Sequence, residues 1–590
     1  MRQYTIDFET TTDINDCRVW AYGVCSIDNN YHFNYGNSID DCMEFLSMHD
    51  GDTFYFHNLK FDGEFIINWL FRNNYVYCEE KKVLPGEFNC LISDMGQFYS
   101  MEICFHNSSK VKIIDSLKIL PFSVSQVAKG FGLEESKLEI DYDKYRPCGY
   151  VLDKKEVAYL KNDVVIMAKA LHTLFKQGLN KMTQGGNALH DYKRMLGEKR
   201  FKKLFPILEY DDFIRKSYKG GYTYVKKGKE GKEIGQGRVY DVNSLYPYVM
   251  YSKLLPYGNG IYYEGKYQND DVYPLYVQEF KCSFELKKGY LPTLQIKNSR
   301  SFFKPNEYLE SSDGKIVTLV MTNVDIELFF EHYEVEDIDY ICGYKFKGAN
   351  GLFKNYIDKW MKIKIESSKN GNHAMRTLAK LMLNALYGKF GLNPIVKSKI
   401  PYLGSDGIVH YSMRDEENRD PVYIPMASFI TAYAREYTIK SGQNNYDRVV
   451  YFDTDSMHIE GLDYPKGITI DDNNLGAWKH ESTFKKAIFH RQKCYIEETY
   501  LERDNLNSDT FDKITASGMT KRCYSSIDLE KNENANFREL YNRELKNGNE
   551  INNGVTFENF KLGKSFIGNF SFTHCVGGIV LVPKVFTLRE

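Results

Sequence analysis

The feature that most constrains this chain is the short segment Tyr451–Ser456, in which two aspartates stand two residues apart between β-prone runs. This pattern predicts a hairpin that carries Asp453 and Asp455 at its tip. A third aspartate, Asp241, lies far earlier in the chain, and placing it beside Asp455 concentrates negative charge that only cations can neutralise. Two Mg²⁺ ions, with Mn²⁺ as a substitute, are what in-line phosphoryl transfer from a nucleoside triphosphate requires. The pattern therefore predicts a nucleotidyl transferase.

Length and composition narrow the class of protein. The 590 residues are enough for several domains, and the 43% hydrophobic content supports packed cores. The 77 basic residues nearly balance 79 acidic ones, which argues against a protein that coats nucleic acid but allows a basic groove beside acidic metal sites. The 12 cysteines form no CxxC pair, so we expect neither a zinc ribbon nor a disulfide framework, and an intracellular location. We also expect no signal peptide and no membrane-spanning segment.

Three regions differ in pattern along the chain. Residues 1 to about 180 alternate short strands with helices, and residues from about 190 to 515 contain the aspartates described above. The segment Lys531–Gly554 is rich in Asn, Lys and Glu, which predicts an exposed helix or a linker before a β-rich tail.

The first region has acidic residues of its own. Asp7 and Glu9 end the first predicted strand, Asp62 lies at the start of a helix, and Asp163 lies in a helix that we expect Asp153 to cap. Together, the four carboxylates Asp7, Glu9, Asp62 and Asp163 could hold two divalent ions. Tyr159 precedes Asp163 by four residues, so both project from one helical face and the phenol could orient an attacking water. Each feature alone is more often structural than catalytic, and only their order favours a phosphodiester-hydrolysing site.

A helix between the two aspartate motifs carries a polar stripe. Lys380, Asn384 and Tyr387 are spaced i, i+4 and i+7, and we expect Gly388 to end or bend this helix. An ammonium, an amide and an aromatic ring on one face could bind a triphosphate and a base. The alternative is an ordinary surface helix with one basic residue.

Taken together, these motifs resemble those of family B DNA polymerases. DFET, HNLKFDG and YLKND are similar to the exonuclease motifs of the DEDDy 3′–5′ proofreading domain, and DxxSLYP, KxxxNxxYG and YxDTDS resemble polymerase motifs A, B and C. The resemblance implies a multidomain α/β fold. It would combine an RNase H-like 3′–5′ exonuclease domain with a right-hand polymerase of palm, fingers and thumb.

The resemblance also implies roles for individual residues. Asp241 and Asp455 would hold metal ions with the carbonyl of Val242, Asp453 would be an auxiliary acid, and Tyr246 would exclude a ribose 2′-OH. The incoming nucleotide would contact Lys364, Lys380, Asn384 and Tyr387. The expected DNA-binding residues are Thr10, His57, Asn58, Phe61, Ser116, Leu117, Lys137, Tyr218, Gly220, Gly221, Thr431, Arg435, Lys493 and Tyr495, with Lys137 also supporting the exonuclease reaction.

Two extra segments make the chain similar to the protein-primed subgroup, the phi29-like polymerases of small tailed phages. The expected boundaries are 1–182 for the exonuclease domain, 183–295 for the first part of the palm, 296–350 for a first insertion that contacts a terminal protein, 351–394 for the fingers, 395–419 for a second insertion that supports strand displacement and processivity, 420–513 for the rest of the palm and 514–590 for the thumb.

This resemblance implies a set of partners and a location. The partners would be primer-template DNA, single-stranded DNA, dNTPs and a separate terminal protein that primes synthesis, with the chain acting as a monomer or a 1:1 heterodimer in the cytoplasm of an infected bacterial host. Two alternatives remain from the residues themselves. One is a DEDDy exonuclease whose C-terminal region only binds DNA, and the other is a replication scaffold with degenerate sites.

Overall fold

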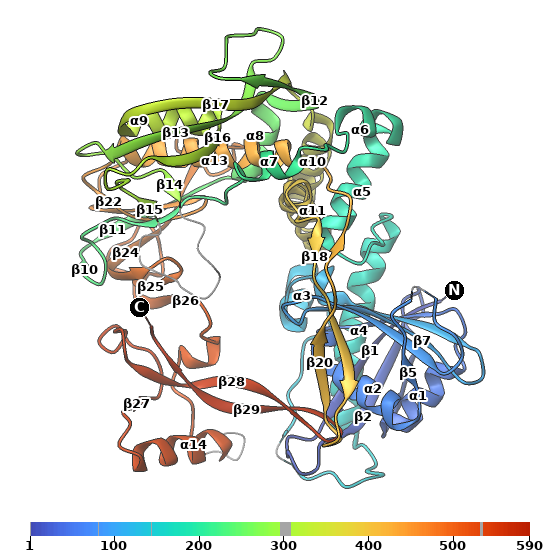
Figure 1. Ribbon diagram of the computed structural model, residues 1–590. Coiled ribbons are helices and arrows are strands. Elements are labelled where there is room, and N and C mark those ends of the chain that lie inside the picture. Colours follow the sequence, from blue (N-terminus) through green and yellow to red (C-terminus); the bar gives the residue numbers. More distant parts are fainter. Residues whose placement is uncertain (1, 81, 143, 296–307, 531–534, 590) are drawn as a thin grey trace.

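The structure is a computed structural model that describes residues 2–80, 82–142, 144–295, 308–530 and 535–589 (Figure 1). The segment from Ile296 to Arg300, which suggested the first insertion, lies outside the described residues. No helix in the described ranges is long and apolar enough to cross a membrane.

The N-terminal region is built on an eight-stranded sheet with the order β3-β2-β1-β4-β8-β7-β6-β5. Its strands are β1 (Gln3–Thr10), β2 (Val19–Ser26), β3 (Phe33–Gly36), β4 (Thr53–Phe56), β5 (Val76–Tyr77), β6 (Glu87–Ile92), β7 (Phe98–Cys104) and β8 (Lys110–Asp115). The accompanying helices are α1 (Ile39–Ser47), α2 (Leu59–Arg72), α3 (Val124–Phe131) and α4 (Lys154–Lys176), with a 3₁₀ turn, η1 (Ser116–Lys118), after β8.

Two features hold helix α4 in place: a cap at its first turn and close packing against the sheet. Asp153 caps it in a capping box with Glu156, as the sequence predicts. The helix packs on β1 and β2. A Cβ at Gly23 of β2 would lie 2.7 Å from Leu160 of α4, so glycine permits this close approach.

The central region contains a second large sheet with the order β26-β25-β24-β11-β23-β22-β9, and β10 pairs with β24. Its strands are β9 (Thr223–Val225), β10 (Glu233–Ile234), β11 (Gly237–Val242), β22 (Val449–Asp453), β23 (Ser456–Glu460), β24 (Trp478–Arg491), β25 (Cys494–Tyr500) and β26 (Thr510–Ala516). Helices α5 (Gln184–Leu196), α6 (Glu198–Leu204) and α7 (Asp211–Arg215) lead into it, and α8 (Leu245–Ser252) packs against the largely buried α13 (Ile424–Gln443).

A third sheet crosses the boundary expected at residues 295–296. Its order is β12-β17-β13-β16, formed by β12 (Leu255–Glu264), β13 (Leu275–Leu286), β16 (Val317–Thr322) and β17 (Tyr333–Ala349), with α9 (Asn323–His332) beside it. Strands from both sides of the expected boundary share ladder hydrogen bonds. The described part of the segment 296–350 therefore shares its sheet with β12 and β13, which precede the expected boundary.

The segment expected to form the fingers, 351–394, contains α10 (Lys354–Lys369), α11 (His373–Ala385) and α12 (Tyr387–Phe390). The expectation that Gly388 ends or bends the motif B helix is wrong in its position, because α11 ends at Ala385, the interruption falls at Leu386, and Gly388 lies inside α12. The chain then forms two nested strand pairs, β18 (Ile395–Val396) with β21 (Glu417–Asn418) and β19 (Lys399–Leu403) with β20 (Val409–Met413).

The C-terminal region contains a 3₁₀ turn, η2 (Lys521–Cys523), α14 (Ala535–Lys546), and the strands β27 (Ile551–Asn552), β28 (Ser565–Cys575) and β29 (Gly578–Thr587). The predicted helix and β-rich tail are present. The helix is not fully exposed, because Phe537 and Leu540 are buried in a small core with Ile551 and Ile567. The β28–β29 hairpin extends from the C-terminal region to the N-terminal region, where its turn lies beside β20 and α2 (Figure 1).

Candidate functional site

The polymerase-like carboxylates meet on neighbouring strands. Asp241 pairs with Ser456 across β11 and β23, and the Val242 backbone N–H donates to the Asp455 carbonyl oxygen at 2.8 Å. Asp453 and Ser456 close the β22–β23 hairpin, whose turn residue Thr454 has a left-handed φ of 67°. The predicted hairpin and the predicted proximity of Asp241 to Asp455 are therefore both confirmed.

The environment of these acids disfavours their charged forms when no cation is bound. Burial, followed by the charge of Asp455, raises the pKa of Asp241 to about 7. Burial also raises the pKa of Asp455, with a further contribution from Asp453. Asp453 itself forms an ion pair with Lys493, which fits an auxiliary acid better than a metal ligand. Paired, partly buried oxygen donors of this kind fit a hard divalent cation.

These acids line a cavity of about 1220 Å³, and basic side chains line the same cavity. Lys364 of α10 and Lys380 of α11 both line it, as the resemblance implies. Sequence reasoning missed Arg376, which lies one helical turn before Lys380 and lines the same cavity. Burial and the charges of Lys380 and Arg376 lower the pKa of Lys364. Three cations held this close together are suited to a polyanion such as a triphosphate.

Aromatic rings form the floor between the acids and the cations. Tyr246 of α8 and Tyr387 of α12 are stacked with their ring centroids 3.9 Å apart. A Cβ at Gly221 would lie 2.6 Å from the Thr454 side chain and 3.0 Å from the Tyr246 hydroxyl, so only glycine lets this backbone approach the hairpin. Asn384 is exposed at the cavity wall.

The expected primer contacts divide into accessible and buried residues. Lys493 is exposed in the cavity, and Tyr495 reaches it although the ring is mostly buried. Tyr218 and Gly220 lie on the partly exposed segment that leads to β9.

Direct primer contact by Thr431 and Arg435 is wrong, because both side chains are 1% exposed. The Thr431 hydroxyl donates to the Ala427 carbonyl at 2.9 Å. The Arg435 guanidinium binds both Asp325 carboxylate oxygens at 2.8 Å and donates to the Lys219 and Gly220 carbonyls at 2.9 and 2.8 Å. Arg435 therefore anchors the segment that contains Gly220 to α9.

The exonuclease-like acids also gather in one place. Carboxylate oxygens of Asp7, Glu9 and Asp163 lie within 4.8 Å of one another. Burial and the charge of Asp163 raise the pKa of Asp7 to about 7, and burial together with Asp7 raises the pKa of Asp62. The Oδ1 atom of Asp163 is buried without a hydrogen-bond partner. An unpartnered oxygen among clustered oxygen ligands fits a bound divalent cation.

Two residues stand beside Asp163 and Tyr159 at the mouth of this site. Lys137 donates to Asp163 Oδ2 at 2.8 Å, in keeping with its expected supporting role. The Tyr142 hydroxyl lies 2.7 Å from the Tyr159 hydroxyl. Sequence reasoning missed Tyr142, because it belongs to a loop without periodicity; its only signal is its position between Lys137 and the helix cap.

The remaining exonuclease residues lie on the segments that carry the acids. Thr10, Asn58, Phe61 and Leu117 are partly exposed there. The expected DNA contact by the Ser116 side chain is wrong: the side chain is fully buried, donates to the Phe56 carbonyl and lies 3.0 Å from His57 Nδ1. Asp115, which the sequence analysis did not single out, accepts hydrogen bonds from the backbone N–H groups of Asn58 and Leu117.

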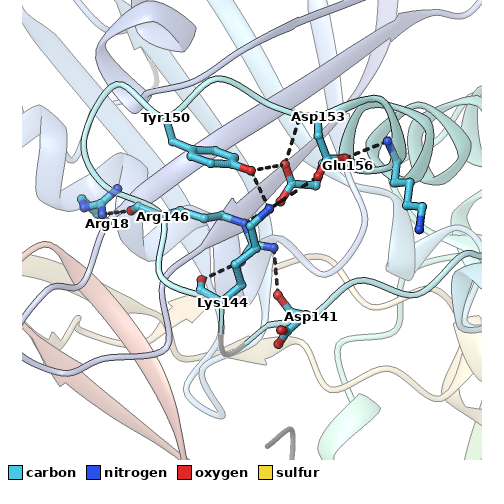
Figure 2. Close-up of polar contacts among 8 residues, drawn as sticks. Arg18, Asp141, Lys144, Arg146, Tyr150, Asp153 and Glu156 are labelled. Atoms are coloured by element: carbon cyan, nitrogen blue, oxygen red, sulfur yellow. Dashed lines mark hydrogen bonds and ion pairs between the residues drawn. The ribbon is translucent and has the colours of Figure 1, made fainter.

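A buried arginine holds the loop that carries Lys137 and Tyr142 (Figure 2). The Arg146 Nε atom donates to Glu156 at 2.9 Å, and its terminal nitrogens donate to the carbonyls of Lys144 and Asp141 at 3.0 and 2.8 Å. Its guanidinium also lies 4.1 Å from the Trp20 ring centroid. Since Glu156 belongs to the capping box of α4, this network ties the loop to the helix that carries Tyr159 and Asp163.

Comparison with known proteins identifies the family of the chain. Residues 43–474 match the family model described as DNA polymerase type B, organellar and viral. The DNA polymerase of Bacillus phage phi29 is 46% identical over 100% of this chain and 99% of its own length, and that of Streptococcus phage Cp-1 is 32% identical over 100% and 98%. The structure of phi29 DNA polymerase complexed with primer-template DNA and incoming nucleotides has a TM-score of 0.88 at 45% identity, with both chains fully covered.

The resemblance stated from the motifs is therefore confirmed, and the mixed α/β architecture matches that of a polymerase with an exonuclease domain. Full coverage in both directions leaves no part of the chain outside this relationship. The protein belongs to the type B DNA polymerase family and, within it, to the phi29-like phage DNA polymerases.

Proposed function

We propose that this DNA polymerase extends primer-template DNA at the site of Asp241 and Asp455 and proofreads at the site of Asp7, Glu9, Asp62 and Asp163. The observation that carries the first assignment is that two partly buried acids, brought together by β11 and the β22–β23 hairpin, line the same cavity as three cations. Acids alone would fit many metal sites, whereas acids that share a cavity with cations fit a metal-bound triphosphate.

The residues divide the work of nucleotide addition. Asp241, Asp455 and the Val242 carbonyl would hold two divalent ions, which we propose to be Mg²⁺ with Mn²⁺ as a substitute. When bound, these ions would lower the pKa of the attacking hydroxyl and neutralise the negative charge of the phosphates. Lys364, Arg376 and Lys380 would bind the phosphates of the dNTP.

Other residues around the same cavity would contact the sugar of the incoming nucleotide and the end of the primer. The stacked pair Tyr246 and Tyr387 would lie under the sugar and base of the incoming nucleotide, leaving no space for a 2′-hydroxyl. Lys493 and Tyr495 would contact the primer end, while Gly220 and Gly221 bring their backbone to the same turn.

Proofreading would use the N-terminal site on single-stranded DNA. The four carboxylates would hold divalent ions, Tyr159 would orient the attacking water with support from Tyr142, and Lys137 would keep Asp163 in place. Thr10, Asn58, Phe61 and Leu117 would contact the strand, with His57 and Ser116 shaping the floor beneath it.

Priming and location are further parts of the proposal. Initiation would use a hydroxyl of a separate terminal protein in place of a 3′-OH, with the insertion that includes β16, α9 and β17 as its contact surface. The pair of hairpins between 395 and 419 would support strand displacement. The enzyme would act in the cytoplasm of the infected bacterium.

A primed template with Mg²⁺, incubated with and without dNTPs, tests the assignment. Extension with dNTPs and shortening without them are expected. Shortening under both conditions, at dNTP concentrations that saturate related polymerases, would instead favour an exonuclease whose C-terminal region only binds DNA. Extension through a downstream duplex by the purified chain alone tests strand displacement.

A further inference from the structure

A buried hydrogen-bonded pair lies inside the central sheet, which carries Asp241 and the β22–β23 hairpin. His458 of β23 has an exposed fraction of 1%, and Glu497 of β25 has one of 0%. The His458 Nδ1 atom lies 2.6 Å from Glu497 Oε1. Burial opposes the ionised form of Glu497, but His458, followed by Lys513, holds the pKa of this carboxyl below its usual value. Because an ionised carboxylate only accepts hydrogen bonds, Nδ1 of His458 is the donor.

This pair joins two strands that are not neighbours in the sheet. The strand order β25-β24-β11-β23 places two strands between the one that carries Glu497 and the one that carries His458. The sheet therefore curves until β25 approaches β23, and the contact between the two side chains, the His458–Glu497 bridge, connects these strands directly. Aromatic rings pack around the bridge, with the His458 ring centroid 5.1 Å from that of Tyr451 and 5.6 Å from that of Tyr495.

One end of the bridge leads to the residues proposed to contact the primer. Glu497 follows Tyr495 by two residues in β25, so their side chains lie on one face of the strand. Lys493 stands in the turn just before β25, where its backbone N–H donates to the Tyr451 hydroxyl at 3.0 Å. The Lys493 ammonium forms an ion pair with Asp453. Lys493 and Tyr495 therefore both depend on how β25 is placed.

The other end of the bridge leads to the acids proposed to bind metal. The His458 Nε2 atom lies 3.4 Å from the hydroxyl oxygen of Ser456. Ser456 follows Asp455 directly and pairs with Asp241 across β23 and β11. The bridge thus connects the strand that follows the primer-contacting turn with the strand that follows the acidic hairpin tip.

We propose that the His458–Glu497 bridge positions Lys493 and Tyr495 relative to the acidic residues and thereby sets how tightly the polymerase site holds the primer end. This inference rests on the proposed polymerase function. The packing of aromatic rings is largely non-directional, whereas a hydrogen bond to an ionised carboxylate is short and directional, so the bridge fixes the distance between β23 and β25. Neither residue is assigned a contact with substrate or metal, so both are positioning residues.

The bridge should also influence the choice between extension and proofreading. In the proposed function, the primer end moves between the polymerase site and the exonuclease site. A primer end that is held less tightly at Lys493 and Tyr495 spends more time in the exonuclease site, so removal of the bridge should favour degradation without any change at the exonuclease residues.

Addition of one nucleotide by the full chain tests the bridge. The primer-template is titrated, and the last linkage of the primer is a phosphorothioate, which slows its degradation. His458→Phe and Glu497→Ala should raise the KM for primer-template about tenfold, the order expected for losing a hydrogen bond to a charged group, with kcat within about twofold of the parent. Glu497→Gln keeps an oxygen that can accept from His458, so its KM should stay within about threefold of the parent value.

Two further measurements separate positioning from a general structural role. With an ordinary primer, the dNTP concentration at which shortening gives way to extension should rise about tenfold in His458→Phe and Glu497→Ala, while degradation of single strands stays within about twofold of the parent. Glu498→Gln is the matched control, because Glu498 lies on the opposite face of β25, where it pairs with Lys485 and Lys486. This control should change neither measurement.

The His458→Phe, Glu497→Leu double variant keeps the proposal testable if a single variant fails to fold. It replaces both polar groups with apolar ones and leaves no unpaired buried charge, so it should fold and still show the raised KM. A folded double variant with the KM of the parent would overturn the proposal, as would equal losses of extension and single-strand degradation. A parent protein that degrades single strands but adds no nucleotide would instead count against the proposed polymerase function.

Discussion

Tyr246 and Tyr387 stack with their ring centroids 3.9 Å apart and inclined by 20°, which joins α8 to α12. In the proposed function, the sugar of the incoming nucleotide would lie over this pair, and the two rings would leave no room for a second hydroxyl. We expect Tyr246→Val to reduce discrimination against ribonucleotides by on the order of 100-fold, about 2.7 kcal/mol in transition-state binding. The ratio of kcat/KM for dNTP and NTP in single-nucleotide extension measures it. Tyr246→Phe, which keeps the ring, should retain the discrimination, and unchanged selection in the Val variant would remove the gate role.

The two acidic sites should be separable by mutation, because they belong to different sheets. Asp455→Asn is expected to abolish primer extension while single strands are still shortened, and the Asp7→Ala, Glu9→Ala double variant should do the reverse. Gel assays of a labelled primer, alone and annealed, report both activities in one experiment. Loss of both activities from either change, in protein that melts normally, would indicate a single shared site.

The buried ion pair between Arg435 and Asp325 predicts a large effect on stability. Removing one partner leaves a buried charge without compensation, so Arg435→Met should cost about 3–5 kcal/mol. The Arg435→Met, Asp325→Leu double variant should recover part of this loss, which urea denaturation followed by fluorescence can measure. If the double variant is as unstable as the single one, the carbonyl contacts to Lys219 and Gly220, rather than the ion pair, carry the effect.

The sequence predicted the location of the acidic residues better than the location of the residues that hold neighbouring segments in place. Asp453 and Asp455 could be placed because a hairpin fixes the geometry of adjacent residues, and Asp241 could be placed beside Asp455 because clustered acids with intervening cations fit a metal site and the motif resembles motif A. The assignment of Arg435 to the primer rests only on the resemblance of its segment to a primer-contacting motif. Its partner Asp325 is 110 residues away, and only the packing of α13 against α9 brings the two together.

The burial of Ser116 and the end of the motif B helix were also missed, because local sequence patterns do not reveal tertiary contacts. Burial of Ser116 depends on β4 and η1 lying side by side, a tertiary contact that periodicity does not encode. Helix α11 ends at Ala385, before the fully buried Leu386, and not at the nearby Gly388. Arg376 could have been found, since it extends the stripe of Lys380 and Asn384 by one helical turn.

Arg146 should matter for proofreading although it touches no substrate. A lysine keeps the charge, but its three donors share one nitrogen and cannot replace the three separate nitrogens through which Arg146 donates to Glu156 and two carbonyls, so Arg146→Lys should loosen the loop that carries Lys137 and Tyr142. We expect the kcat for degradation of single-stranded DNA to fall by about tenfold or more, with KM changed less and primer extension retained. Lys155→Ala, an exposed position on the same helix, is the control. Equal losses in extension and degradation would show a general folding defect instead.

At both acidic sites, the stability of the metal-free protein should fall as the pH rises, whereas the binding of divalent metal ions should become stronger. The folded protein keeps the protons of Asp7 and Asp241 up to a pKa of about 7, whereas the unfolded chain releases them near 4. Between these values the folded state binds more protons, so metal-free stability should fall as pH rises through this window.

Mg²⁺ binds the ionised carboxylates, and at 100 times its dissociation constant it should add about 2.7 kcal/mol per site. Melting curves at pH 5 and pH 8, with EDTA or Mg²⁺, should therefore show a larger rise with metal at pH 8. The Asp7→Ala, Asp241→Ala variant should lose most of that difference, and an equal rise at both pH values would contradict carboxylate binding.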